Sequence, residues 1–174
     1  LQNSFMGQIS AREPITITPL DIMQAFEQAL EQQSPIGQEE TIGMYQKFVL
    51  NLVEMASQSA EAQKNPQFIL ELGKLIARTN ELFDANTGIF PGLKQQYING
   101  GINLRYGLSF NQRPFLERGK RLYTEALTIA PKRLEFIRVL MEVARVENDA
   151  AALTRWQSKA HEYRPDLFQK PTAS

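Results

Sequence analysis

The chain has 174 residues, and its 19 Lys plus Arg balance 19 Asp plus Glu, for a net charge of +0. This length allows a domain with a sizeable core, and the balanced charge argues against nucleic acid or an acidic membrane surface as a partner held by long-range attraction. The absence of cysteine excludes disulfides, thiolate zinc sites and cysteine nucleophiles, and it leaves the redox compartment open.

The apolar segments are short. The longest runs, such as FVLNLV and FIRVLMEVA, fall well below the ~20 apolar residues that span a bilayer. No basic stretch followed by an apolar one suggests a signal peptide, and the chain begins with Leu1 instead of Met. We therefore expect a segment that does not itself span a membrane and that comes from a longer protein.

Helical spacing of apolar residues dominates the chain, and strand-like alternation is nearly absent, so the predicted fold class is all-α. Residues 1–18 are predicted to form an extended lead-in, with Thr18 capping the first helix and Pro19 in its first turn. Residues 168–174 are expected to form a flexible tail. Between the lead-in and the tail, about seven helices are predicted, and their short connections imply that neighbouring helices are antiparallel. Their predicted ranges are 19–32, 38–60, a third from 66 to the loop around ANTGIFPG, 93–111, 114–129, 132–147 and 149–164.

Two short phrases repeat at a fixed offset. Ala126 and Pro131 recur as Ala160 and Pro165, 34 residues later. An offset of 34 residues is the period of the tetratricopeptide repeat, a helix–turn–helix unit. Residues 100–133 resemble this repeat well, and residues 134–167 resemble a weaker, terminal copy with Met141 where glycine is expected.

The resemblance assigns packing roles to small and aromatic residues. Glycine allows two helices to cross closely, an aromatic ring fills the space between helix pairs, and proline ends a helix. The resemblance to the tetratricopeptide repeat predicts a right-handed superhelix of stacked, antiparallel helix pairs over 19–167, in which each pair covers the apolar face of its neighbour. Ordinary antiparallel helices of a bundle are the alternative. The residues with predicted packing roles are Gly107, Phe110, Gly119, Tyr123, Ala126, Pro131, Ala160 and Pro165.

In arrays of this kind the first helix of each pair lines a groove, so the resemblance also suggests a binding surface. We expect a groove that is apolar on one side and charge-paired on the other, suited to a peptide segment of a partner protein. The charged residues could equally be exposed (i, i+3) pairs that only support their helix. The candidate groove residues are Leu104, Leu108, Asn111, Glu135, Arg138, Glu142 and Arg145.

The order of features resembles a larger architecture. The phrases FEQALEQQSPIGQEETIGMYQKFV and RGKRLYTEALTIAPKRLEF are similar to segments in the C-terminal extracytoplasmic tail of bacterial O-antigen ligase or polymerase-like membrane proteins. The resemblance spans about residues 20–167. It implies a non-catalytic assembly domain, tethered outside the cytoplasm, whose partner could be the membrane part of its own chain. A free-standing cytoplasmic scaffold that binds peptides is the alternative.

The same residues contain no motif that predicts catalysis, metal binding or nucleotide binding. His161 has no second His or Cys at metal-ligand spacing, and adjacent Glu39 and Glu40 point about 100° apart on a helix. The NGG at 99–101 lacks the strand and the Gly-Lys-Ser/Thr of a phosphate loop. Trp156 is expected either to pack or to anchor a partner. We predict no catalytic residue, no metal ligand and no cofactor.

Overall fold

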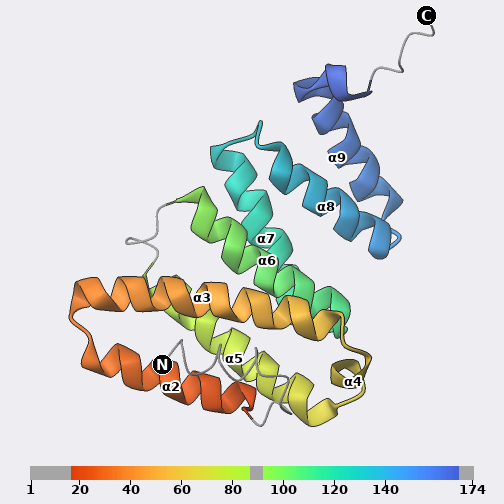
Figure 1. The fold of residues 1–174 in the computed structure, drawn as a ribbon. Coiled ribbons are helices and arrows are strands. Elements are labelled where there is room, and N and C mark those ends of the chain that lie inside the picture. The colour runs from red at the N-terminus through yellow and green to blue at the C-terminus, as the bar shows by residue number, and fades with distance from the viewer. Residues whose placement is uncertain (1–16, 87–91, 169–174) are drawn as a thin grey trace, which may run out of the picture. The chain divides into compact units, whose positions relative to one another are not determined.

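In the computed structural model, residues 17–86 and 92–168 are described, and they form helices joined by turns (Figure 1). The predicted all-α class is confirmed. The predicted lead-in up to residue 16, the loop at residues 87–91 and the tail from residue 169 lie outside the described residues. The helices of the described residues are α2 (Pro19–Gln32), α3 (Pro35–Ser57), α4 (Ala60–Gln63), α5 (Pro66–Ala85), α6 (Leu93–Ser109), α7 (Arg113–Ile129), α8 (Leu134–Val146), α9 (Ala150–Tyr163) and the 3-10 helix η1 (Pro165–Phe168).

Local capping signals explain where several helices begin. The Thr18 side chain accepts a hydrogen bond from the Asp21 N–H, and the Asp21 carboxylate accepts one from the Thr18 N–H, so both partners of a capping box are present. The Asn65 side chain accepts a hydrogen bond from the Phe68 N–H, with Pro66 as the first helical residue. The short α4, which was not predicted, is capped by Ser59 after α3 has ended at Ser57.

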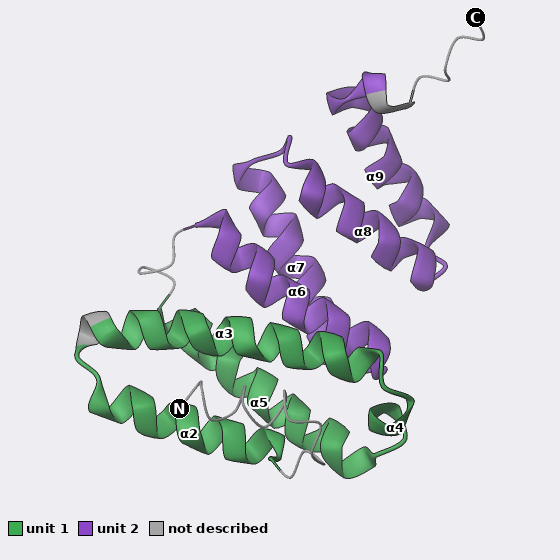
Figure 2. Cartoon of the chain, in the orientation of Figure 1, with its two compact units in different colours: residues 1–91 green, residues 92–174 purple. Residues whose placement is uncertain are grey.

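The chain divides into two compact units, residues 1–91 and 92–174 (Figure 2). The sequence predicted one continuous repeat domain over 19–167. In unit 1, α2, α3 and α5 pack against one another as three helices around one core. Its buried hydrophobic residues are Ile22, Phe26, Leu30, Ile42, Tyr45, Val49, Val53, Ala56, Leu72, Leu75, Ile76, Leu82 and Phe83.

Polar contacts join α2 to the other two helices of unit 1. The Arg78 guanidinium on α5 forms a two-pronged contact with the Glu27 carboxylate on α2, in which Nη2 donates to Oε2 over 3.0 Å. The Gln38 amide on α3 donates to the Leu30 carbonyl near the end of α2 over 3.0 Å. The Phe26 ring lies 4.5 Å from the Tyr45 ring. These contacts fix the three helices of unit 1 around the core.

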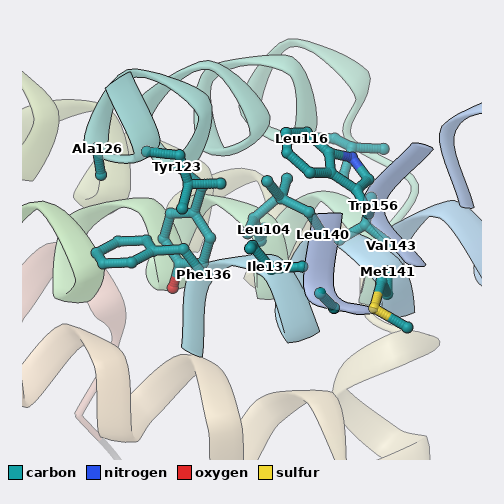
Figure 3. Packing of buried hydrophobic residues seen from close by; sticks show 12 residues of the cluster. Leu104, Leu116, Tyr123, Ala126, Phe136, Ile137, Leu140, Met141, Val143 and Trp156 are labelled. Carbon is teal, nitrogen blue, oxygen red and sulfur yellow. The ribbon is translucent and has the colours of Figure 1, made fainter. Parts of the chain in front are cut away.

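Unit 2 consists of two helix pairs, α6 with α7 and α8 with α9. One cluster of buried side chains joins all four helices and includes Leu104, Tyr123, Phe136 and Trp156 (Figure 3). An ion pair between Lys120 Nζ and Glu147 Oε1, at 2.9 Å, links α7 to the residue that directly follows α8. Hydrogen bonds to Glu147 and Glu117 raise the pKa of Lys120, although partial burial of its ammonium group acts the other way and is the larger single influence.

The crossing of α6 and α7 depends on glycine, as the repeat predicted. A Cβ added at Gly107 would lie 2.6 Å from the Leu116 backbone nitrogen. One added at Gly119 would lie 2.6 Å from Leu104 Cγ and 2.9 Å from the Gly100 carbonyl oxygen. A third, at Gly100, would meet the Tyr123 ring at 2.5 Å. Glycine weakens a helix, and here the close approach of a neighbouring helix offsets that cost.

Tyr123 connects the first pair to the second. It is 1% exposed, and its ring stacks on Tyr97 of α6 at 5.3 Å and meets the edge of Phe136 of α8 at 5.0 Å. Its hydroxyl donates to the Tyr97 carbonyl over 2.9 Å. The ring thus contacts both α6 and α8. The other predicted packing residues also stand at helix contacts or ends: Phe110, Ala126 and Ala160 are buried, Pro131 lies between α7 and α8, and Pro165 begins η1.

Buried phenols make the stability of the fold sensitive to alkali. Burial raises the pKa values of Tyr45 and Tyr123, and it raises the pKa of Tyr106 to about 12. An unfolded tyrosine titrates near about 10, so the folded state holds these protons more tightly. The free energy that this contributes is present below about pH 10 and is lost as the pH rises through the folded pKa.

We therefore expect the free energy of unfolding to fall above about pH 10, by up to about 1.4 kcal/mol per pH unit for each buried phenol. The Tyr106→Phe variant should show a shallower fall than the wild type between about pH 10 and the pKa of about 12. Urea unfolding at a series of pH values, followed by circular dichroism, measures both slopes. Equal slopes in the two proteins would contradict this assignment to Tyr106.

Candidate functional site

Helix α8 separates apolar and charged side chains sharply. Six of its residues face the core and are buried, including Phe136, Ile137 and Leu140. The opposite side carries charges at a spacing of three and four residues, which keeps them on one face. We call this surface the charged face of α8, and it consists of Glu135, Arg138, Glu142, Arg145 and Val146.

The charges on this face alternate in sign and are mostly exposed. Arg145 Nη1 lies 3.1 Å from Glu142 Oε2, three residues apart on the same helix. Glu135 instead takes its close contact from outside the helix, because Arg133 Nε donates to Glu135 Oε1 over 2.6 Å. That hydrogen bond lowers the pKa of the Glu135 carboxyl, with partial burial acting against it and the nearby Arg138 guanidinium adding a smaller influence in the same direction.

The charged face also holds one large apolar side chain. Val146 closes α8 and is 55% exposed, beside Arg145 and one turn after Glu142. Glu135 in the first turn and Arg145 in the last turn complement the helix dipole. The charges thus support their own helix and at the same time leave an exposed, alternating pattern available to a partner.

The three groove residues predicted on α6 do not join this surface. Leu104 is 3% exposed and packs in the buried cluster of unit 2, so its prediction as a groove residue is wrong. Leu108 is partly buried and packs against the same cluster. Asn111 is exposed at a φ of 54°, where it ends α6 in the left-handed conformation that asparagine tolerates.

A shift within the repeat explains the error at Leu104. The last residues of α6 and α8, Ser109 and Val146, are 37 residues apart, whereas the last residues of α7 and α9, Ile129 and Tyr163, are 34 apart. The period of 34 residues therefore relates the ends of α7 and α9, the second helices of the two pairs. It does not relate the ends of α6 and α8, the first helices. Measured from the helix ends, Leu104 corresponds to the buried Met141 and not to the exposed Arg138.

The same shift resolves the apparent departure at Met141, where the 34-residue period expects glycine. Gly107 corresponds instead to Ala144, a small residue that is 4% exposed. A small side chain thus occupies the equivalent position in both pairs, as close helix packing requires. The signal was available in the sequence as an Asn following each first helix, Asn111 and Asn148, both of which adopt positive φ.

The remaining candidates of the sequence are not among the residues of the charged face of α8. Trp156 is 8% exposed in the buried cluster, so it packs and does not anchor a partner, and its ring carries the Arg155 guanidinium at 5.2 Å. His161 is exposed on α9, and Glu39 and Glu40 are exposed on α3. Across residues 17–86 and 92–168, no three His, Cys, Asp or Glu side chains gather in a way that could hold a metal ion.

Among the helices of the described residues, none combines the length and the apolar character needed to cross a bilayer. No family model matches the chain, and no curated protein and no solved structure matches it either.

Proposed function

We propose that this chain is a non-catalytic, tetratricopeptide-like domain that mediates protein contact or assembly. The observation that carries the proposal is the charged face of α8, an exposed pattern of alternating charges held on a helix whose other side is locked into the core of unit 2. Rigid helices that present a fixed row of side chains lose little entropy on binding, which suits recognition of a protein or peptide.

The packing of unit 2 supports the repeat-like part of the proposal. Gly107 and Gly119 allow α6 and α7 to cross closely, and Tyr123 joins this pair to α8. The last helix, α9, exposes mainly polar residues on its outer side, as a terminal repeat does. As for its context, we propose the extracytoplasmic tail of an O-antigen ligase or polymerase-like membrane protein, on the basis of the two quoted phrases, with a cytoplasmic scaffold as the alternative.

The test is a capture experiment with matched variants. The full 174-residue chain is immobilised, and envelope and cytosolic fractions of the source cells are passed over it separately. The comparison uses an Arg138→Glu/Arg145→Glu variant and, as a control, Arg121→Glu on the exposed side of α7, whose partner is Glu125 at 3.2 Å. All variants are checked for an unchanged thermal melt.

We expect the wild type and the Arg121→Glu control to capture a defined protein. The Arg138→Glu/Arg145→Glu variant should fail to capture it. Retention from the envelope fraction favours the membrane-tail context, and retention from the cytosolic fraction favours the scaffold. Identical capture by all three proteins would contradict a role for the charged face of α8.

A further inference from the structure

The charges of α8 and its flanking residues are arranged symmetrically about Leu140, with opposite signs on the two sides. In RLEFIRVLMEVARVE, residues 133–147, each charge has an opposite charge at the same distance on the other side of Leu140. Apolar residues stand opposite apolar residues in the same way. The mirrored pairs that carry charge are Arg133 with Glu147, Glu135 with Arg145, and Arg138 with Glu142, and Leu134 mirrors Val146.

This symmetry matters when two such helices run antiparallel. A two-fold axis that runs between the two helices at the level of Leu140 brings each exposed residue of one charged face against the mirrored residue of the other, because a dyad interface uses the same patch on both subunits. Each charge of the charged face then meets an opposite charge, Glu135 with Arg145 and Arg138 with Glu142. A parallel arrangement in register would instead place like charges together. We propose that a second copy of this chain docks antiparallel on the charged face of α8.

The exposed side chains of the structure satisfy the geometry of this contact. Arg138, Glu142 and Arg145 are exposed, Glu135 keeps part of its surface open, and the six buried residues of α8 point the other way. The 13 residues of α8 span about 20 Å, long enough for two pairs of opposite charges on each side of the axis. Antiparallel helices approach within about 8–10 Å, a gap that Arg and Glu side chains bridge.

The same features set the strength of the contact. Exposed ion pairs each stabilise little, and one helix face covers less than the roughly 800 Å² per partner of a standard interface. Within one chain, Glu142 already pairs with Arg145, and Glu147 with Lys120, so association exchanges some contacts as it adds others. A weak dimer that dissociates with salt is therefore expected. At about 1 M salt the screening length is about 3 Å, short enough to suppress the attraction.

This inference rests on the proposed function, since it names a second copy of the chain as the partner of the charged face of α8. Sedimentation equilibrium of the full chain over a range of concentrations, at low and at high salt, measures the association. The variants are Arg138→Glu and Glu142→Arg, each alone, mixed together, and combined in one chain. Arg121→Glu on α7 is the control.

The mirrored pairing gives each sample a distinct expectation. The wild type and the control dimerise at low salt and are monomeric at high salt. Either single variant places two pairs of like charges across the axis and should associate at least about 10-fold more weakly. The Arg138→Glu variant is acidic at positions 138 and 142, and the Glu142→Arg variant is basic at both. A mixture of the two should therefore recover association. The combined variant exchanges the two charges and should recover it as well.

Two results would overturn the inference. A wild type that stays monomeric at low salt would do so directly, and a mixture no stronger than either single variant would exclude the mirrored pairing. Unchanged thermal melts show that the variants are folded. If the wild type is monomeric yet capture from cell fractions still depends on the charged face of α8, this inference fails and the proposed function stands.

Discussion

Replacing Gly107 by alanine should lower the free energy of unfolding by about 2 kcal/mol, in spite of the higher helix propensity of alanine. The added Cβ would lie 2.6 Å from the Leu116 nitrogen and 2.7 Å from its Cα. Backbone atoms cannot move aside as the end of a flexible side chain does, so α6 and α7 must separate. Urea unfolding followed by circular dichroism measures the change.

The matched control is Gly43→Ala in α3. No atom lies within 4 Å of a Cβ added at Gly43, and this residue is also inside a helix. At this position only the higher helix propensity of alanine acts, so the free energy of unfolding of Gly43→Ala should rise by up to about 1 kcal/mol. If Gly107→Ala is as stable as the wild type, then α6 and α7 do not cross as closely as described.

Removal of the Tyr123 ring should have the larger effect, a loss of about 3–5 kcal/mol in Tyr123→Ala. The ring is buried and contacts Tyr97 and Phe136, so the deletion leaves a cavity where α6, α7 and α8 meet. Tyr123→Phe keeps the ring and loses only the hydrogen bond to the Tyr97 carbonyl, at a cost of about 1 kcal/mol.

The chain offers a built-in reporter for this comparison. Trp156 is the single tryptophan and is buried in the same cluster as Tyr123, so its fluorescence follows the unfolding of unit 2. Thr124→Ala, at an exposed position of the same helix, should change stability by no more than about 0.5 kcal/mol. Equal losses for Tyr123→Ala and Tyr123→Phe would show that the ring does not hold the two pairs together.

Local chemistry made much of the fold predictable. Thr18 with Pro19 and Asn65 with Pro66 mark helix starts through side-chain caps and a fixed proline φ, and both starts were predicted to the residue. Gly107, Gly119 and Tyr123 were predicted as packing residues because close helix crossings require small side chains and a filling ring.

Features that depend on a third helix were harder to predict. Leu104 has the spacing of a groove residue, but it packs close to Gly119 of α7 and in the cluster that α8 and α9 share, and a shift of three residues within the repeat changed its register. The partner of Glu135 was also missed, because Arg133 stands before the helix begins, where (i, i+3) rules do not apply. The three-helix packing of unit 1 had no counterpart in the 34-residue pattern.

We propose that the charged face of α8 is the contact surface of this chain. The most direct test is an NMR experiment in which an isotope-labelled chain is titrated with excess unlabelled chain at low salt. We expect the amide signals that shift to belong to the exposed residues of 133–147, and the shifts to be absent for Arg138→Glu. Shifts confined to α7 or α9, or unaltered by that substitution, would contradict the account.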